Sequence, residues 1–201
     1  MRTSLSSSLR FWSITTCSLA LLAAGCDSAA PKFKSTDITG VDYGKALELA
    51  DTGGRVRHLE DFRGKAVVVF FGFTHCPDVC PTTLADMAAG LKTLGPDADR
   101  VQVVFITVDP ERDTAADLDK YVKAFDPRFF ALRGDAAATQ RVAKDFKIYY
   151  EKRKQGDTYT VDHSSQSYVI DPKGRLRLLV RPDRLASDLA PDLRALLSEK
   201  S

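Results

Sequence analysis

The sequence predicts one α/β domain, and three observations point to that class. Continuous apolar runs, typical of strands buried on both faces, occur at residues 66–71 and 101–108. Between and after these runs, apolar residues recur at helical spacing. The composition of the 201 residues, 44% hydrophobic and 28% charged, is that of a globular chain of about one domain. Helices that alternate with buried strands favour an α/β sandwich.

The charge balance and the mean hydropathy each argue against one class of protein. Lys and Arg number 29 and Asp and Glu 27, which gives a formal net charge of +2. Proteins that bind nucleic acid usually carry a clear basic excess, so we expect no nucleic-acid partner. The mean hydropathy of −0.19 also excludes a protein with many membrane spans.

The first residues have the pattern of a signal peptide. Arg2 and Arg10 give a positive start, and residues 11–25 are uncharged and largely apolar. This stretch is short for a membrane span, which needs roughly 20 apolar residues. It ends in the small residues before Cys26, and that ending resembles the bacterial lipoprotein signal. We therefore expect residues 1–25 to be a signal peptide and Cys26 to carry the lipid.

One departure keeps an alternative open. The commonest lipoprotein pattern has Leu three residues before the cysteine, whereas this chain has Ala23. An ordinary secretory signal with an incidental cysteine is the alternative. In the lipoprotein interpretation, residues 26–34 form a tether and residues 35–201 form the folded domain. That domain would be held at the extracytoplasmic (periplasmic) face of a bacterial membrane by its lipid.

The first elements of the domain form a βαβ unit. A hairpin is expected at residues 45–59, with its turn at 51–54. The buried strand at 66–71 is followed by a helix, whose apolar face spans residues 84–94, and by the second buried strand at 101–108. Two parallel strands joined through a helix require a crossover, which is right-handed in nearly all proteins.

The elements after the second buried strand indicate which α/β fold this is. They are a helix after a capping box at Thr114, a strand at 129–132, a helix capped by Asp135, a hairpin at 148–161, strands at 167–170 and 176–180, and a helix over 189–197. We expect Pro191 in the first turn of this last helix, where proline is tolerated. A βαβ unit, an inserted α-β-α stretch and a ββα unit, with two cysteines after the first buried strand, predict a thioredoxin-like fold.

Cysteine usage points to redox or metal chemistry. Cys17 lies in the signal and Cys26 is the expected lipid site, so Cys76 and Cys80 are the thiols of the folded domain. A disulfide across three intervening residues closes almost no loop and stabilises the chain little. A redox-active or metal-binding pair is therefore favoured over a structural disulfide.

The position of the pair favours the thiolate form. The segment lies between the carboxyl end of a strand and the start of a helix, where negative charge is stabilised. Cys76 and Cys80 each precede a proline, which disfavours helical backbone at both. We therefore expect a tight loop between them, with Pro81 opening the helix. Two thiolates this close can chelate one soft ion, Cu(I) or Zn.

One histidine is a candidate third ligand. Of the three in the chain, His58 lies in a charged hairpin, and His75 is adjacent to Cys76 and hard to aim at the same ion. His163 lies in the loop before the last two strands, at 167–170 and 176–180. In a thioredoxin-like fold, the loop at this point faces the cysteine loop. His163 is therefore the favoured candidate.

Four segments together resemble one family. They are Phe71–Pro81, Val108–Asp113, Phe125–Phe129 and Val161–Ser164. In combination they are similar to the Sco family, also called SenC or PrrC, from about Asp37 to the C-terminus. Its members are membrane-anchored, thioredoxin-like copper-binding proteins that help to assemble cytochrome c oxidase. Many members have a transmembrane anchor, whereas this chain is expected to use a lipid.

The resemblance implies a function and residue roles. Cys76, Cys80 and His163 would bind copper, as Cu(I) or Cu(II), and Asp78 would serve partner docking or tuning of the site. Asp109-Pro110 matches a loop that borders the site, although a simple turn at a strand end explains it equally well. The implied function is delivery of copper to the dinuclear centre in the copper-centre subunit of cytochrome c oxidase, which is transport rather than catalysis. Other copper chaperones or thioredoxin-like reductants are further implied partners.

Three alternatives remain open from the sequence. A thiol–disulfide oxidoreductase that reduces the copper-site cysteines of the oxidase would need Cys76 and Cys80 but not His163. A peroxidase of peroxiredoxin type would need an activating arginine beside one thiol. Copper storage or tolerance would use the same ligands. An oxidised cysteine pair offers no thiolates, so the disulfide form should bind copper poorly.

Overall fold

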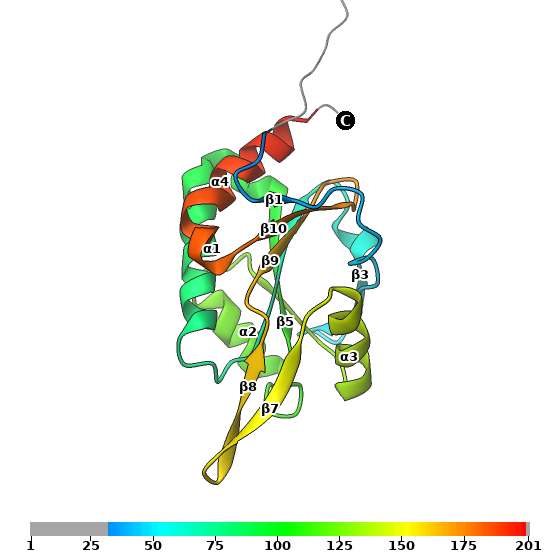
Figure 1. Cartoon of the computed structure of the whole chain (residues 1–201), viewed down its shortest axis with the longest axis vertical. Helices are drawn as coiled ribbons and strands as arrows, with labels where there is room; N and C mark the ends of the chain where they lie inside the picture. The colour runs from blue at the N-terminus through cyan, green and yellow to red at the C-terminus, as the bar shows by residue number, and fades with distance from the viewer. Residues whose placement is uncertain (1–31, 200–201) are drawn as a thin grey trace, which may run out of the picture. The chain divides into compact units, whose positions relative to one another are not determined.

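The computed structural model describes residues 32–199 and has a central eight-stranded sheet with helices on both faces (Figure 1). The expected signal peptide at 1–25, Cys26 and most of the tether at 26–34 lie outside the described residues. Within residues 32–199, no helix combines the length and the apolar content needed to cross a bilayer. Near the start of the described residues, the backbone amide of Lys34 donates a hydrogen bond to the Asp192 carboxylate over 2.7 Å.

The sheet has three parallel strands at its centre. Its order is β1-β10-β9-β4-β5-β6-β2-β3. The strands are β1 (Thr36–Asp37), β2 (Glu48–Asp51), β3 (Val56–His58), β4 (Ala66–Gly72), β5 (Val101–Thr107), β6 (Phe130–Arg133), β9 (Ser167–Ile170) and β10 (Leu176–Val180). β4, β5 and β6 are parallel, and β9 joins β4 in the antiparallel sense. The mixed α/β, thioredoxin-like fold predicted from the sequence is confirmed.

Two hydrophobic cores lie on the two faces of the sheet. The helices are α1 (Val79–Leu94), α2 (Ala115–Lys123), α3 (Ala136–Asp145) and α4 (Pro182–Ser198), with short 3-10 turns η1 (Leu59–Phe62) and η2 (Gly95–Arg100). α1, α2 and α4 cover one face, and α3 and η1 cover the other (Figure 1). Along β4, Val68 and Phe70 enter the first core, whereas Val67, Val69 and Phe71 enter the second. This alternation explains why the sequence shows one continuous apolar run.

A separate hairpin extends from the body of the domain. It consists of β7 (Tyr150–Gln155) and β8 (Thr158–His163), which pair with each other and form a two-stranded sheet of their own (Figure 1). Its turn contains Gly156 at φ +61°, a conformation that favours glycine. The hairpin therefore matches the one expected at residues 148–161.

Two expected helix starts are wrong. α1 begins at Val79, so Cys80 is in its first turn and Pro81 takes the third position rather than the first. Amides in the first turn have no partner within the helix, so a proline there forfeits no hydrogen bond. The bias of a residue before proline against helical backbone is a preference, and here the start of the helix overrides it.

The last helix also starts earlier than expected. α4 begins at Pro182, which leaves Pro191 inside the helix rather than in its first turn. A proline in a helix interior costs about 3 kcal/mol. Leu185, Leu189 and Leu193 of the same helix are at most 1% exposed. Their burial, at about 1.5–3 kcal/mol each, offsets that cost.

Candidate metal centre

The cysteine segment joins the end of β4 to the start of α1. β4 ends at Gly72, Cys76 lies in the connecting loop, and Cys80 is in the first turn of the helix. Both thiols are free; Cys76 is partly exposed and Cys80 is fully buried. The pair therefore occupies the strand-end and helix-start position that the sequence predicts.

The environment of Cys76 stabilises its thiolate. A hydrogen bond from the Cys80 thiol has the largest effect, and contacts with His163 and with the amides of Cys80 and Asp78 act in the same direction. The Cys80 amide donates to the Cys76 sulfur over 3.4 Å. Although burial opposes these contacts, together they lower the pKa of Cys76 to about 4. Cys76 is therefore ionised at neutral pH.

Cys80 responds in the opposite direction. Its hydrogen bond to the Cys76 sulfur and then its burial raise the pKa of Cys80 well above the usual range. The charges of Cys76 and Asp113 add to this effect. The pair thus retains one proton at neutral pH, and a metal ion bound by both sulfur atoms would displace it.

His163 is the last residue of β8 and faces the two thiols. Its Nδ1 lies 2.9 Å from the Ser164 carbonyl oxygen. Its Nε2 lies 3.5 Å from the Cys80 sulfur, so this nitrogen faces the two thiols. The rings of Phe70 and Phe73 pack edge-on to the imidazole, at centroid distances of 6.2 and 5.8 Å.

The three side chains form a donor set for one soft metal ion. Their ligand atoms all lie within 4.8 Å of one another, and this is the one such group of three found in residues 32–199. Two sulfurs and one imidazole nitrogen suit Cu(I), Cu(II) or Zn, and poorly suit Mg or Ca. A histidine whose second nitrogen binds a carbonyl is the usual arrangement of a metal ligand. The residues present therefore fit a copper ion.

Other candidate residues lie outside this group. Asp78 is exposed and occupies the N-cap position of α1, but its side chain makes no capping bond. His75 is exposed, and its Nδ1 lies 3.0 Å from the Thr74 hydroxyl. His58 ends β3, in the hairpin at the edge of the sheet. The structure thus brings His163, and neither of the other histidines, to the cysteines.

A buried carboxylate supports the cysteine segment and was not singled out from the sequence. Asp113 is 0% exposed and accepts hydrogen bonds from the Thr74 amide and from the hydroxyls of Thr74 and Thr107. Thr74 and Thr107 follow or end two neighbouring parallel strands, β4 and β5. Polar residues at adjacent strand ends were the signal that could have identified this network.

Gly72 allows the Cys80 sulfur to approach the strand. A Cβ atom added at Gly72 would lie 2.7 Å from that sulfur and 2.8 Å from the ring of Phe105. No side chain fits at such distances without movement of its neighbours. Glycine at the end of β4 is therefore a requirement of the site's geometry.

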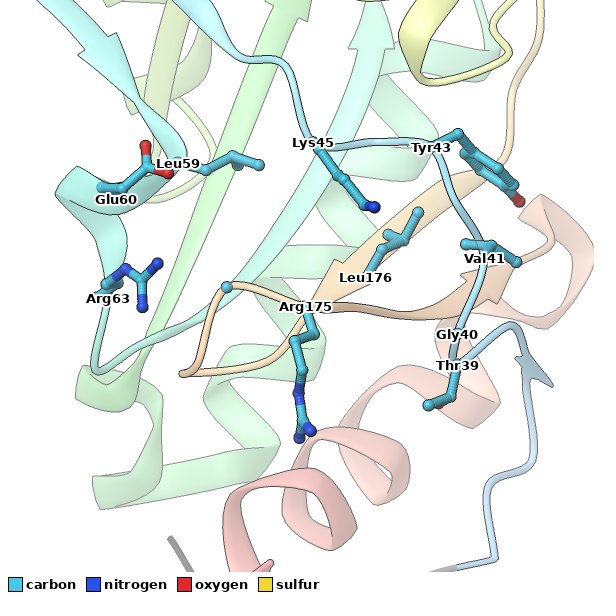
Figure 2. A pocket seen from close by; sticks show the side chains of 11 residues that line it. Thr39, Gly40, Val41, Tyr43, Lys45, Leu59, Glu60, Arg63, Arg175 and Leu176 are labelled. Carbon is cyan, nitrogen blue, oxygen red and sulfur yellow. The ribbon is translucent and has the colours of Figure 1, made fainter.

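A pocket of about 520 Å³ is lined by residues that precede β2 and β4 and by the turn that enters β10, and by no residue of the cysteine segment (Figure 2). Its three basic residues, Lys45, Arg63 and Arg175, come from separate segments. Lys45 binds Asp42, and Arg175 binds a carboxylate in its own turn. This pocket contains no cysteine or histidine and is not a candidate for the same chemistry.

Comparisons with known proteins agree on one family. The family model described as SCO1/SenC matches residues 35–198. A protein described as the mitochondrial SCO2 homolog of Bos taurus is 43% identical over 132 residues, which cover 64% of this chain and 50% of the bovine protein. This chain therefore spans about half the length of that relative.

Two solved structures are similar to this chain in both fold and sequence. Copper-bound ScoI from Bradyrhizobium japonicum is 39% identical with a TM-score of 0.69, and the match covers 75% of this chain and 97% of that one. Apo Sco1 from Thermus thermophilus is also 39% identical, with a TM-score of 0.73, and the match covers 84% and 99% of the two chains.

Proposed function

Because the chain belongs to the SCO1/SenC family, we propose that it binds copper through Cys76, Cys80 and His163 and delivers it during assembly of cytochrome c oxidase. The observation that carries this proposal is the convergence of the three donor atoms within 4.8 Å. The relative from Bradyrhizobium japonicum, at 39% identity, is described with copper bound. Copper is the cargo of this protein, and the receiver is the dinuclear copper centre of the oxidase.

The two sulfurs have different roles in this mechanism. Cys76 is partly exposed and ionised, so it is the first donor that an incoming ion meets. Cys80 is buried and loses its proton as the ion is bound. The Nε2 of His163 completes the site. Transfer then proceeds by ligand exchange, in which thiolates of the receiving protein replace these donors one after another.

The redox state of the pair controls this cycle. Exchange with a disulfide of another protein would form a Cys76–Cys80 disulfide, pass the two electrons and the remaining proton of the pair to that protein's two sulfurs, and leave no thiolate on either residue. The oxidised chain should therefore bind copper poorly, and reduction by a thioredoxin-like partner should restore binding. We infer that Asp78, which is exposed between the two cysteines, contacts the docking protein.

Copper titration of the full-length reduced chain tests the site. Cys76→Ser and Cys80→Ser should each weaken the binding of Cu(I) and of Cu(II) by well over the tenfold that corresponds to about 1.4 kcal/mol. His163→Ala should weaken the binding of Cu(II) by as much, because Cu(II) favours nitrogen ligands. His58→Ala is the matched control, because that histidine lies outside the donor group. Parent-like binding of Cu(I) and Cu(II) by His163→Ala would show that the ligand assignment is wrong.

Delivery needs a separate assay. The copper-loaded chain is mixed with a reduced, metal-free copper-site domain of the oxidase, and metal on that domain is measured. The parent should metallate it, and His163→Ala should fail. A parent that binds copper but transfers none would refute delivery and leave storage as the function.

A second function, thiol–disulfide exchange, is favoured by the low pKa of the partly exposed Cys76. Its thiolate would attack a disulfide of the oxidase copper site and form a mixed disulfide. Cys80 would then displace the target thiol, which leaves the target reduced and this pair oxidised. This reaction does not require His163. Equal rates for the parent and His163→Ala with an oxidised target peptide, without metal transfer, would establish it.

We also propose that a lipid on Cys26 anchors the domain at the periplasmic face of the membrane. The support is the sequence of the first 26 residues, with its positive start, short apolar core and small residues before the cysteine. Cys26→Ala should abolish lipid modification. Mass spectrometry that finds an unmodified mature N-terminus at another residue would refute the anchor.

A further inference from the structure

The hairpin that carries His163 depends on the rest of the domain for its position. β7 and β8 pair with each other and with no strand of the central sheet. An isolated two-stranded hairpin is marginally stable in water. The place of the imidazole is therefore set by contacts between the hairpin and the body of the domain.

Polar contacts join the hairpin to the loop after β5. The central ones involve three residues, which we call the clamp: Asp109, Arg112 and Tyr159. The Tyr159 hydroxyl donates to a carboxylate oxygen of Asp109 over 2.8 Å. Arg112 donates through Nη1 to the Tyr159 carbonyl oxygen over 2.8 Å and through Nε to Asp109. The guanidinium also lies over the Tyr159 ring, 3.8 Å from its centroid.

Burial makes the clamp stronger than a surface ion pair. Asp109 is 0% exposed, and the side chain of Arg112 is 21% exposed. Charges shielded from water interact more strongly than exposed ones, and loss of one partner leaves the other unpaired. By contrast, the neighbouring Lys152–Glu111 bridge, at 2.6 Å, also joins this loop to the hairpin but is exposed on both sides.

Two sets of contacts connect the clamp to the metal site, one at the cysteine segment and one at His163. Val108, directly before Asp109, donates its amide to the carbonyl oxygen of Gly72 over 2.8 Å, beside the cysteine segment. Arg112 lies 5.8 Å above the ring of Phe73. That ring in turn packs edge-on against His163. A shift of Arg112 would therefore reach the imidazole through the phenyl ring and through the hairpin.

We propose that Arg112, with Asp109 and Tyr159, is a positioning residue that holds His163 Nε2 within reach of the two sulfurs. The inference rests on the proposed function, since it concerns the third ligand of the copper site. Cu(I) is satisfied by thiolates, whereas Cu(II) favours nitrogen ligands. Loss of the clamp should therefore weaken Cu(II) binding selectively and leave the binding of Cu(I) by the cysteine pair.

The test uses the full-length reduced chain without oxygen. Tyr159→Phe removes one hydrogen bond and keeps the ring, and Arg112→Gln removes the charge and the stacking. Glu111→Gln is the matched control, because it breaks only the exposed bridge. Electron paramagnetic resonance reads the nitrogen coupling of bound Cu(II), and titrations with Cu(I) and Cu(II) give the affinities. Thermal unfolding of the metal-free chains shows that each variant is folded.

We expect Arg112→Gln to lose nitrogen coupling and at least tenfold in Cu(II) affinity, Tyr159→Phe to lose less, and Glu111→Gln to match the parent. Cu(I) affinity should stay within about threefold, which is a change below 1 kcal/mol. In a His163→Ala background, Arg112→Gln should have no further effect on Cu(II), because the two changes act through one ligand.

Two results would overturn the inference. One is parent-like nitrogen coupling and Cu(II) affinity in folded Arg112→Gln and Tyr159→Phe. The other is an equal loss from Arg112→Gln with and without His163, which would indicate a general structural effect. A parent that binds no copper would instead refute the proposed function itself, and the clamp's role at the metal with it.

Discussion

The cysteine segment and the β7–β8 hairpin supply donor atoms to the same site but are built differently. Cys76 packs against both hydrophobic cores, and Cys80 is fully buried in the first turn of α1. Most of the hairpin is exposed, and the clamp attaches it to the body. The sulfur atoms are therefore preorganised, whereas the nitrogen is held by a peripheral element. Such a division suits a carrier, which must release its metal as well as bind it.

The largest effect on stability is expected at the buried support of the cysteine segment. Asp113→Ala removes the acceptor for the Thr74 amide and for two threonine hydroxyls. Unsatisfied buried polar groups cost about 1–3 kcal/mol each. We expect the free energy of unfolding of the reduced chain to fall by about 2–5 kcal/mol in urea titrations.

The matched control for this prediction is Asp117→Ala, four residues further along the chain. Asp117 is exposed and lies in the first turn of α2, where it accepts a hydrogen bond from the Thr114 hydroxyl. Its loss should cost about 0.5–1 kcal/mol. Equal losses from Asp113→Ala and Asp117→Ala would show that the cysteine segment does not depend on its buried carboxylate.

A smaller loss is expected from Gly72→Ala. The added Cβ would lie 2.7 Å from the Cys80 sulfur, and overpacking of this kind costs about 1–3 kcal/mol. The sulfur must also move, so copper affinity should fall together with stability. In contrast, Gly90→Ala in α1 meets Leu189 at an acceptable 3.4 Å and adds a better helix former. Urea unfolding that ranks Gly90→Ala below Gly72→Ala in stability would contradict this account.

The contrast between the two regions also shows what a sequence can predict. The buried strands were predictable because both faces of the sheet are covered, which gives continuous apolar runs such as residues 66–71. The caps at Thr114 and Asp135 follow from local chemistry, and both accept the expected amide. The starts of α1 and α4 were misjudged because the effects of proline depend on burial and on position within the helix.

The long-range contacts of the site were less predictable. The placement of His163 followed from the overall plan of the fold rather than from any local pattern. The role of Asp109 was ambiguous, because a turn at a strand end and a site-bordering loop have the same local sequence. Its partner Tyr159 is 50 positions away in the chain. Tyr159 lies on a hairpin, and no local sequence pattern shows where that hairpin packs on the domain. Such pairings depend on which surfaces the finished sheet leaves free.

The two regions should also differ in their influence on the ionisation of Cys76. The Cys80 hydrogen bond has the largest effect in lowering the pKa of Cys76 to about 4, and the His163 contact has a smaller one. We expect the pH profile of iodoacetamide alkylation of Cys76 to shift upward strongly in Cys80→Ala and less in His163→Ala. A larger shift in His163→Ala would assign control of the thiolate to the hairpin.

The same pKa sets the pH dependence of stability. The pKa of Cys76 is lower in the folded chain than in the unfolded chain, where a thiol has a pKa near 8.5. The ionised Cys76 therefore stabilises the folded state, and this contribution is complete at a pH above about 8.5. The contribution is lost as the pH falls toward about 4. The unfolding free energy of the reduced chain should therefore decrease from pH 8.5 to pH 5 more steeply in the parent than in Cys76→Ser. Parallel curves for the two chains would contradict the depressed pKa.

The smallest effect on global stability is expected at the hairpin turn. Gly156 has φ +61°, and Gly156→Ala meets no atom within 4 Å, so its cost is the backbone strain of about 1–2 kcal/mol. If the hairpin opens separately from the sheet, this strain increases the population of the open hairpin and leaves the free energy of global unfolding almost unchanged. Hydrogen exchange of the β7 and β8 amides should therefore speed up about tenfold, while exchange in β4 stays at the parent rate. A loss of global stability as large as that of Gly72→Ala would mean that hairpin and sheet unfold as one unit, and that the imidazole is held as firmly as the sulfur atoms.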